Sequence, residues 1–141
     1  MTFEEKINEI TQNYNLGNFL KAGNLAKSLL IRNVNNYQLC NIYGSILRRL
    51  NKTEGAISYF QKSIHIKSDF FDAHFNLLQL FYDLKKYDEA IIQSKECLKI
   101  NPESKGTFLT LGNSYNHLNQ VKESEKNFRE ILIINSEDSD A

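Results

Sequence analysis

Histidine and cysteine are the side chains in this sequence that could bind a metal ion or act as a nucleophile or base. The two cysteines, Cys40 and Cys97, are too few and too far apart to indicate a disulfide framework or a zinc site. Free cysteine packs as a small hydrophobic residue, so we expect both to be buried. The three histidines, His65, His74 and His117, are scattered along the chain. These residues therefore predict no metal site and no cofactor.

Acidic side chains such as Glu4, Glu5, Asp88 and Glu89 are the remaining candidates for acid or base chemistry. They lie near expected helix starts, where the helix dipole stabilises a negative charge without any catalytic role. The sequence also has no glycine-rich phosphate-binding loop. We therefore predict that the chain is not an enzyme and has no catalytic residue.

The charge and hydropathy of the chain exclude two classes of partner. Seventeen basic and seventeen acidic residues cancel, so no overall field would hold a polyanion, and we expect no nucleic-acid partner. The N-terminus lacks the pattern of a secretory signal, and no apolar run is long enough to span a membrane. We therefore expect a cytoplasmic protein without membrane association.

The elements that must position any site are predicted to be helices. One proline and six glycines leave few chain-breakers, and apolar residues recur at spacings of three and four over residues 76–100. The short apolar run at residues 131–134 is the one candidate strand, but it follows an amphipathic segment and is expected to be helical.

A 34-residue period runs through the chain. Leucines occur at this interval, and a small residue follows each of them by six positions. The leucines are Leu16, Leu50, Leu84 and Leu118, and the small residues are Ala22, Ala56, Ala90 and Ser124. This spacing predicts four gapless repeats, which cover residues 3–36, 37–70, 71–104 and 105–138.

The residue types at these positions resemble the tetratricopeptide repeat. Repeat four carries Leu111-Gly112, Tyr115 and Phe128, repeat three carries Ala90 and Pro102, repeat two carries Gly44, Ala56 and Phe60, and repeat one keeps Ala22. The resemblance implies an all-α, right-handed superhelix of four antiparallel helix hairpins that forms a single domain over residues 1–141. Small residues such as Gly44, Ala90 and Gly112 are expected where helix axes approach closely.

Several helix boundaries have their own sequence signals. Thr2 and Glu5 have the spacing of a capping box. Asn101-Pro102-Glu103 is expected to begin the first helix of repeat four, with proline at the first helical position. Val34, Ser68 and Ser136 are expected at the equivalent boundaries of the other repeats.

The resemblance implies a concave wall, lined by the first helix of each repeat, that binds a peptide or a partner protein. The predicted groove residues are Asn8, Tyr14, Asn41, Arg48, Phe75, Asn76, Gln79, Tyr82, Asn113 and His117. Amide side chains offer both a donor and an acceptor to an extended peptide, and aromatic side chains provide apolar anchors. Asn8 and Asn76 share the sixth place of the repeat, similar to the asparagine ladder of the O-linked N-acetylglucosamine transferase.

Other interpretations of these groove residues remain open. Asparagine is frequent throughout the chain, so the amides can also be ordinary solvated surface. The cation pair that chaperone-associated repeats use to hold a C-terminal carboxylate is not matched here. Arg48 and Arg49 also fit a solvated pair at a helix end. Within the repeat, His65 occupies an outer place, His74 a packing place typical of a core residue, and His117 a groove place.

Two further hypotheses concern the ends of the chain. Ile131, Ile133 and Ile134 belong to an apolar run that no later helix covers, which suggests self-association, for example as a homodimer. The chain also fits the N-terminal part of a longer protein, including a repeat segment that precedes the catalytic domain of a glycosyltransferase or sulfotransferase. The function predicted first remains a protein-interaction scaffold.

Overall fold

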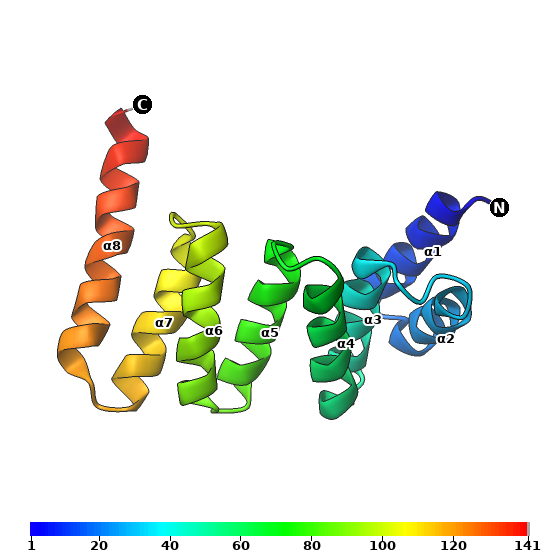
Figure 1. The fold of residues 1–141 in the computed structure, drawn as a ribbon, viewed down its shortest axis with the longest axis horizontal. Coiled ribbons are helices and arrows are strands. Elements are labelled where there is room, and N and C mark those ends of the chain that lie inside the picture. Colours follow the sequence, from blue (N-terminus) through cyan, green and yellow to red (C-terminus); the bar gives the residue numbers. More distant parts are fainter. Residues whose placement is uncertain (141) are drawn as a thin grey trace. The chain divides into compact units, whose positions relative to one another are not determined.

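A computed structural model describes residues 1–140 of the chain, and within that range it contains helices and turns but no β-strand (Figure 1). The helices are α1 (Phe3–Asn15), α2 (Phe19–Leu30), α3 (Tyr37–Arg49), α4 (Thr53–Ile66), α5 (Phe71–Asp83), α6 (Tyr87–Ile100), α7 (Lys105–His117) and α8 (Val121–Asp140). The all-α prediction is confirmed, and the apolar run at residues 131–134 is part of α8. None of these helices, over the described residues, is long and apolar enough to cross a membrane.

The helices follow the 34-residue period. The first helices of the four repeats begin at Phe3, Tyr37, Phe71 and Lys105, which are the predicted repeat boundaries. The second helices begin at Phe19, Thr53, Tyr87 and Val121, at the same interval. Each repeat is thus a helix hairpin, and the predicted register is confirmed.

The chain divides into two compact parts, which are described separately. The N-terminal part comprises Met1–Ala73, and the C-terminal part begins at His74. The boundary lies inside α5, near the start of repeat three.

In the N-terminal part, α1 packs against α2, α2 against α3, and α3 against α4. One buried cluster joins α1, α2 and α3; its members are Ile10, Ala22, Ala26, Leu29, Leu30, Leu39, Cys40 and Ile46. The hydroxyl of Ser63 on α4 donates to the backbone carbonyl of Tyr37 at 2.8 Å, which ties the end of one helix to the start of the other. Stability of this part comes from stacking of successive hairpins.

In the C-terminal part, α6 packs against α7 and α7 against α8. Ala90 on α6 is fully buried, and Ser124 on α8 is 4% exposed. Gly44 in the N-terminal part and Gly112 in the C-terminal part are also buried. Small residues therefore lie at the close helix contacts, as predicted.

Every hairpin turn uses a residue in the left-handed backbone conformation. These residues directly follow the four periodic leucines and are Gly17 (φ 81°), Asn51 (φ 59°), Lys85 (φ 60°) and Asn119 (φ 60°). Leu16, Leu50 and Leu118 are the C-caps of α1, α3 and α7, so the leucine period marks the ends of first helices. The left-handed residue after each leucine reverses the chain.

Three first helices have side-chain caps. The Thr2 hydroxyl accepts from the Glu5 amide at 3.1 Å, and the Glu5 carboxylate accepts from the Thr2 amide at 3.2 Å, so the predicted capping box is confirmed. Asn36 caps α3, and Ser104 caps α7 by accepting from the Thr107 amide at 3.3 Å.

Repeat four begins at Lys105 as predicted, but the expected start of its first helix at Asn101-Pro102-Glu103 is wrong. The Ser104 amide donates to the Asn101 carbonyl at 3.3 Å, and the Asn101 side chain accepts from the Glu103 amide at 3.2 Å. Pro102 therefore occupies the second position of a turn, for which its fixed φ is suited, and α7 begins only at Lys105.

The predicted boundary at Ser136 is also wrong. α8 continues through Ser136 to Asp140, whereas α4 and α6 end at Ile66 and Ile100, each with four residues before the next helix begins. No proline interrupts this segment, and Lys105 of α7 pairs with Asp138 at 2.7 Å, which holds the extended end of α8.

Candidate functional site

In the N-terminal part, the predicted groove positions surround a small cavity between α1 and α3. Its volume is about 240 Å³, and it is lined by Thr11, Tyr14, Asn15, Asn41, Ile42 and Ser45. All six lining residues lie on the first helices of repeats one and two, which were expected to line the groove, and they include the predicted Tyr14 and Asn41. The structure thus brings these side chains together as one site.

Apolar side chains form the walls of this cavity, and none of its lining residues is charged. Tyr14 and Ile42 are half-buried and pack against the core cluster, so their positions are fixed. The remaining lining residues are hydroxyl and amide side chains, and the Ser45 hydroxyl donates to the Asn41 carbonyl at 3.2 Å. Such a site suits an uncharged apolar group whose neighbours form hydrogen bonds.

The other predicted residues of the N-terminal part lie outside the cavity. Asn8 is exposed on α1 and lines a more open hollow of about 630 Å³, which also includes Glu5, Gln12 and Asn15. Arg48 is half-buried on α3.

In the C-terminal part, predicted groove residues of α5 contact α7 directly. The Gln79 amide donates to the Thr110 hydroxyl at 2.8 Å, and that hydroxyl donates to the Gly106 carbonyl at 3.0 Å. The Phe75 ring lies over Gly106, where an added Cβ would be 3.1 Å from the ring. These contacts place α5 and α7 side by side and fix the orientation of both predicted side chains, Phe75 and Gln79. The predicted Asn76 and Asn113 are half-buried on the same two helices.

An aromatic cluster lies where α5 and α7 end. The Tyr82 hydroxyl is 3.3 Å from Nε2 of His117, and the His117 ring stacks on Tyr87 with a centroid distance of 4.5 Å and an interplanar angle of 4°. Burial, and then the neighbouring Tyr87 and Asp83, raise the pKa of Tyr82 above its ordinary value. Tyr82 is therefore a neutral hydrogen-bonding group rather than a base.

The same arrangement occurs in the N-terminal part. The Tyr14 ring meets Phe19 edge to face at 5.3 Å, and the Arg49 guanidinium lies 4.6 Å from the centre of the Phe19 ring. Tyr14, Phe19 and Arg49 precede Tyr82, Tyr87 and His117 by 68 residues, which is two repeats. Arg49 is thus a stacked cation rather than an entirely solvated one.

Phe19 and Tyr87 were not among the predicted site residues. Both begin second helices, whereas the prediction considered first helices alone. The 68-residue spacing of these aromatics, matched by Tyr14 and Tyr82, is the sequence signal that could have identified them.

The predicted self-association residues on α8 differ in exposure. Ile133 is 49% exposed and Ile131 is half-buried, but Ile134 is 6% exposed and contributes to the interior instead. Leu132, between them, is 68% exposed. The apolar surface of α8 is therefore centred on Leu132 and Ile133.

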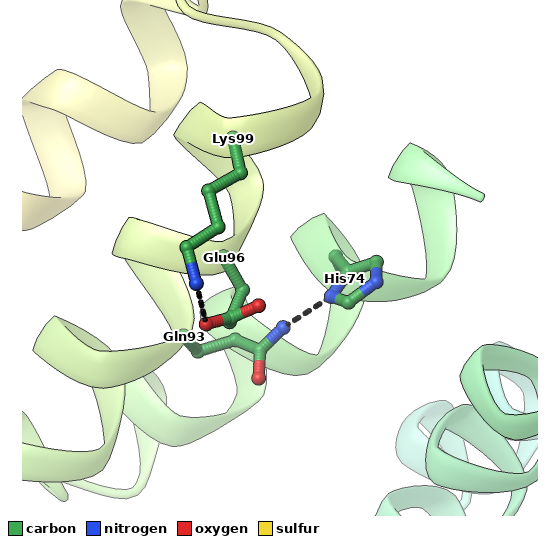
Figure 2. A network of polar contacts seen from close by, with 4 residues as sticks. All are labelled: His74, Gln93, Glu96 and Lys99. Atoms are coloured by element: carbon green, nitrogen blue, oxygen red, sulfur yellow. Dashed lines mark hydrogen bonds and ion pairs between the residues drawn. The ribbon is translucent and has the colours of Figure 1, made fainter. Parts of the chain in front are cut away.

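His74 has a structural environment (Figure 2). It is 6% exposed, and Nε2 of Gln93 lies within hydrogen-bond distance, 2.8 Å, of its Nδ1. Near it on α6, Lys99 donates to Glu96 at 2.8 Å, which lowers the pKa of that carboxyl. The prediction of a core histidine is confirmed. Within the described residues, histidine, cysteine and carboxylate side chains do not gather in threes that could hold a metal ion.

Both cysteines are buried, as predicted. Burial raises the pKa of the Cys97 thiol to about 12, even though a hydrogen bond with Thr107 acts in the opposite direction. Burial also raises the pKa of Cys40. Neither thiol is therefore activated as a nucleophile at neutral pH.

Parts of the chain are similar in sequence to known proteins. Residues 37–70 and 71–104 each match the model of the tetratricopeptide repeat. Part of the chain, 78 residues or 55% of it, is 35% identical to the protein O-mannosyl-transferase Tmtc3 of Drosophila melanogaster, but the match spans 8% of the length of that relative.

Solved structures share the fold at low sequence identity. The crystal structure of MamA superposes with a TM-score of 0.92 over 98% of this chain and 81% of MamA, at 18% identity. YrrB, a tetratricopeptide-repeat protein with an unusual peptide-binding site, superposes with a TM-score of 0.80 over 92% of this chain and 66% of YrrB, at 16% identity.

Proposed function

We propose that this chain, which belongs to the tetratricopeptide repeat family, is a protein-interaction scaffold that holds an extended segment of a partner against its first helices. The observation that carries the proposal is the cavity between α1 and α3, because all of its lining residues lie on first helices of the repeats. The likeness to YrrB supports the same kind of function, since that protein has a peptide-binding site.

The size of the cavity suggests what it accepts. Sites for small organic ligands usually have volumes of about 300 to 1,000 Å³, so a cavity of about 240 Å³ suits a single side chain of a peptide. Its walls are the Tyr14 ring and the Ile42 side chain, which favour an apolar anchor. No charged side chain lines it, so an ionised anchor would lose hydration without gaining a partner.

Hydrogen bonds to the peptide backbone would come from the rim. Asn15 and Asn41 each carry an amide, which can donate to a backbone carbonyl and accept from a backbone amide. In the C-terminal part, Phe75 is held against Gly106, Gln79 is bonded to Thr110, and Tyr82 lies within hydrogen-bond distance of His117. These contacts order the four side chains and lower the entropy lost on binding. We include them, with Asn8, Arg48, Asn76 and Asn113, in the proposed groove.

A substitution that fills the cavity tests this proposal. Peptides selected by display on the full chain should carry an uncharged apolar residue, and Thr11→Phe should weaken their binding at least about tenfold by occupying the anchor position. Ser58→Phe is the matched control, because Ser58 is exposed on α4 away from the cavity. Equal binding by Thr11→Phe, Ser58→Phe and the unmodified chain would remove the cavity from the proposed site.

A second candidate function is a repeat segment of a larger enzyme. The match to the O-mannosyl-transferase Tmtc3 favours it, although the matched region is a small part of that relative. Immunoblotting of the native cell distinguishes the two, since a band near the 16.4 kDa of this chain would contradict the larger enzyme. The same blot on cell fractions tests the proposed cytoplasmic location.

A further inference from the structure

The twenty-eighth place of every repeat is an aliphatic residue, which packs on the following hairpin in repeat one and is exposed in repeat four. The four residues are Leu30, Ile64, Leu98 and Leu132. Leu30 on α2 is 6% exposed and shares the core cluster with Leu39 and Cys40 of α3. Leu132 on α8 is 68% exposed. The exposed apolar face of α8 is therefore equivalent, within the repeat, to the face by which α2 packs on α3.

A complementary surface lies on α1 and α2. A cavity of about 400 Å³ between these helices has an apolar floor of Ile10, Leu25 and Leu29. Its other lining residues are Met1, Phe3, Lys6, Glu9, Ser28, Arg32 and Asn33. We call this cavity the α1–α2 groove.

The repeat period relates this groove to the packing of α2 on α3. Lys6 occupies the same place in repeat one as Cys40 in repeat two, and Cys40 is fully buried in the cluster with Leu30. The α1–α2 groove is therefore the surface that a second helix of a preceding hairpin would cover. A leucine placed there would contact Phe3 and the aliphatic stem of Lys6.

Charge favours α8 as the helix that enters this groove. Over residues 129–138, α8 carries Glu130, Glu137 and Asp138, of which Asp138 is paired with Lys105, against one cation, Arg129, which is paired with Glu125. The groove rim carries Lys6 and Arg32 against the single acid Glu9. Opposite charges on the two surfaces would orient the helix and suppress the alternative pairing of two acidic α8 helices.

We propose that α8 of one copy of this chain docks into the α1–α2 groove of a second copy. The contact joins different surfaces of the two copies, so it is heterologous. An assembly built by this contact has one free groove and one free α8 at its ends, unless these two ends meet and close a ring. This inference concerns surfaces outside the proposed peptide groove.

Complementation between two variants of the full chain tests the inference. Leu132→Glu disables α8, and the double variant Lys6→Glu, Arg32→Glu disables the groove. All three residues are exposed, so the variants should keep the far-UV circular dichroism of the unmodified chain. By sedimentation, the mass of the unmodified chain should rise with concentration from 16.4 kDa. Each variant alone should dissociate at least about tenfold more readily.

An equimolar mixture of the two variants should form a dimer with one copy of each and grow no further, because one variant keeps its groove and the other keeps its α8. Ile92→Glu is the matched control, since Ile92 is 64% exposed on α6 and lies outside both surfaces, and it should associate like the unmodified chain. Three results would overturn the inference: an unmodified chain that stays monomeric up to millimolar concentration, a groove variant that self-associates as tightly as the unmodified chain, or a mixture that stays monomeric.

Discussion

The Phe60 ring of α4 lies against Gly44 of α3 so closely that a Cβ at Gly44 would be 2.8 Å from two atoms of the ring. The same contact recurs 68 residues later, where a Cβ at Gly112 would be 2.6 Å from the Phe128 ring. Phe60 is fully buried, so its ring has little freedom to move away. Glycine at these two places therefore permits a large aromatic residue between the helices of a hairpin.

Alanine at either glycine is expected to destabilise the chain. Overpacking of a core costs about 1 to 3 kcal/mol, and alanine recovers up to about 1 kcal/mol of helix propensity. Gly44→Ala and Gly112→Ala should each lower the free energy of unfolding by about 1 to 2 kcal/mol in urea denaturation followed by circular dichroism.

Two variants separate this steric effect from other causes. Gly55→Ala should cost less than either substitution, because its Cβ would be 3.1 Å from the terminal methyl of one aliphatic side chain, Leu47, rather than from a ring. Phe60→Leu should recover part of the stability of Gly44→Ala by removing ring atoms. An additive effect of Gly44→Ala and Phe60→Leu would contradict the contact as the cause.

The left-handed turn residues predict opposite effects at two equivalent positions. Lys85 adopts φ 60°, which is strained for a residue with a Cβ, so Lys85→Gly should raise the free energy of unfolding by up to about 1 kcal/mol. Gly17 adopts φ 81° with open space around it, so Gly17→Ala should lower the free energy of unfolding by about 1 kcal/mol through backbone strain alone. Thermal or urea unfolding of both variants checks the prediction, which fails if the two shifts have the same sign.

The buried thiol of Cys97 predicts a loss of stability in alkaline solution. Burial raises its pKa in the folded chain to about 12, whereas an unfolded thiol titrates near about 8.5. Deprotonation of this thiol therefore favours the unfolded chain. The stabilisation is fully present below about pH 8.5 and is lost as the pH rises towards 12. Over this range the free energy of unfolding should fall by up to about 1.4 kcal/mol per pH unit. The free energy of unfolding of the unmodified chain should fall more steeply over this range than that of Cys97→Ala. Parallel curves for the two proteins would contradict the prediction.

The capping box at the start of α1 can be tested by one substitution and its rescue. Thr2→Ala removes the hydroxyl that accepts from the Glu5 amide and should cost about 1 kcal/mol. Thr2→Asp restores an acceptor and should recover most of that loss. Amide hydrogen exchange should locate the effect in the first turn of α1, and protection unchanged by Thr2→Ala would mean that the cap contributes nothing.

The fold could be predicted from the sequence because each repeat places its contact residues at the same positions. Ala22, Ala56 and Ala90 are all fully buried, and their spacing alone set the register in which the hairpins stack. Helix boundaries were harder to predict from the sequence where a local hydrogen bond, rather than the repeat period, decides where the helix begins. Pro102 fits both a helix start and a turn, and the bond between Ser104 and Asn101 selects the turn.

The sequence predicted which helix faces carry the candidate site, but it did not predict the contacts between their side chains. The repeat indicated which face of α5 and α7 carries Gln79 and Thr110, but not that these side chains bond to each other. Stacking of His117 on Tyr87 likewise depends on how a first helix meets the start of the preceding second helix. The end of α8 is held by the pair of Lys105 with Asp138, residues 33 positions apart that no helix pattern connects.

The identical turn after each first helix also bears on how the chain acquires its structure. A left-handed residue at Gly17, Asn51, Lys85 and Asn119 closes each hairpin from residues adjacent in sequence. Contacts of this kind cost little loop-closure entropy, and proteins dominated by them fold within microseconds to milliseconds. We expect hairpins to emerge independently during synthesis and to join their neighbours in the order in which they leave the ribosome.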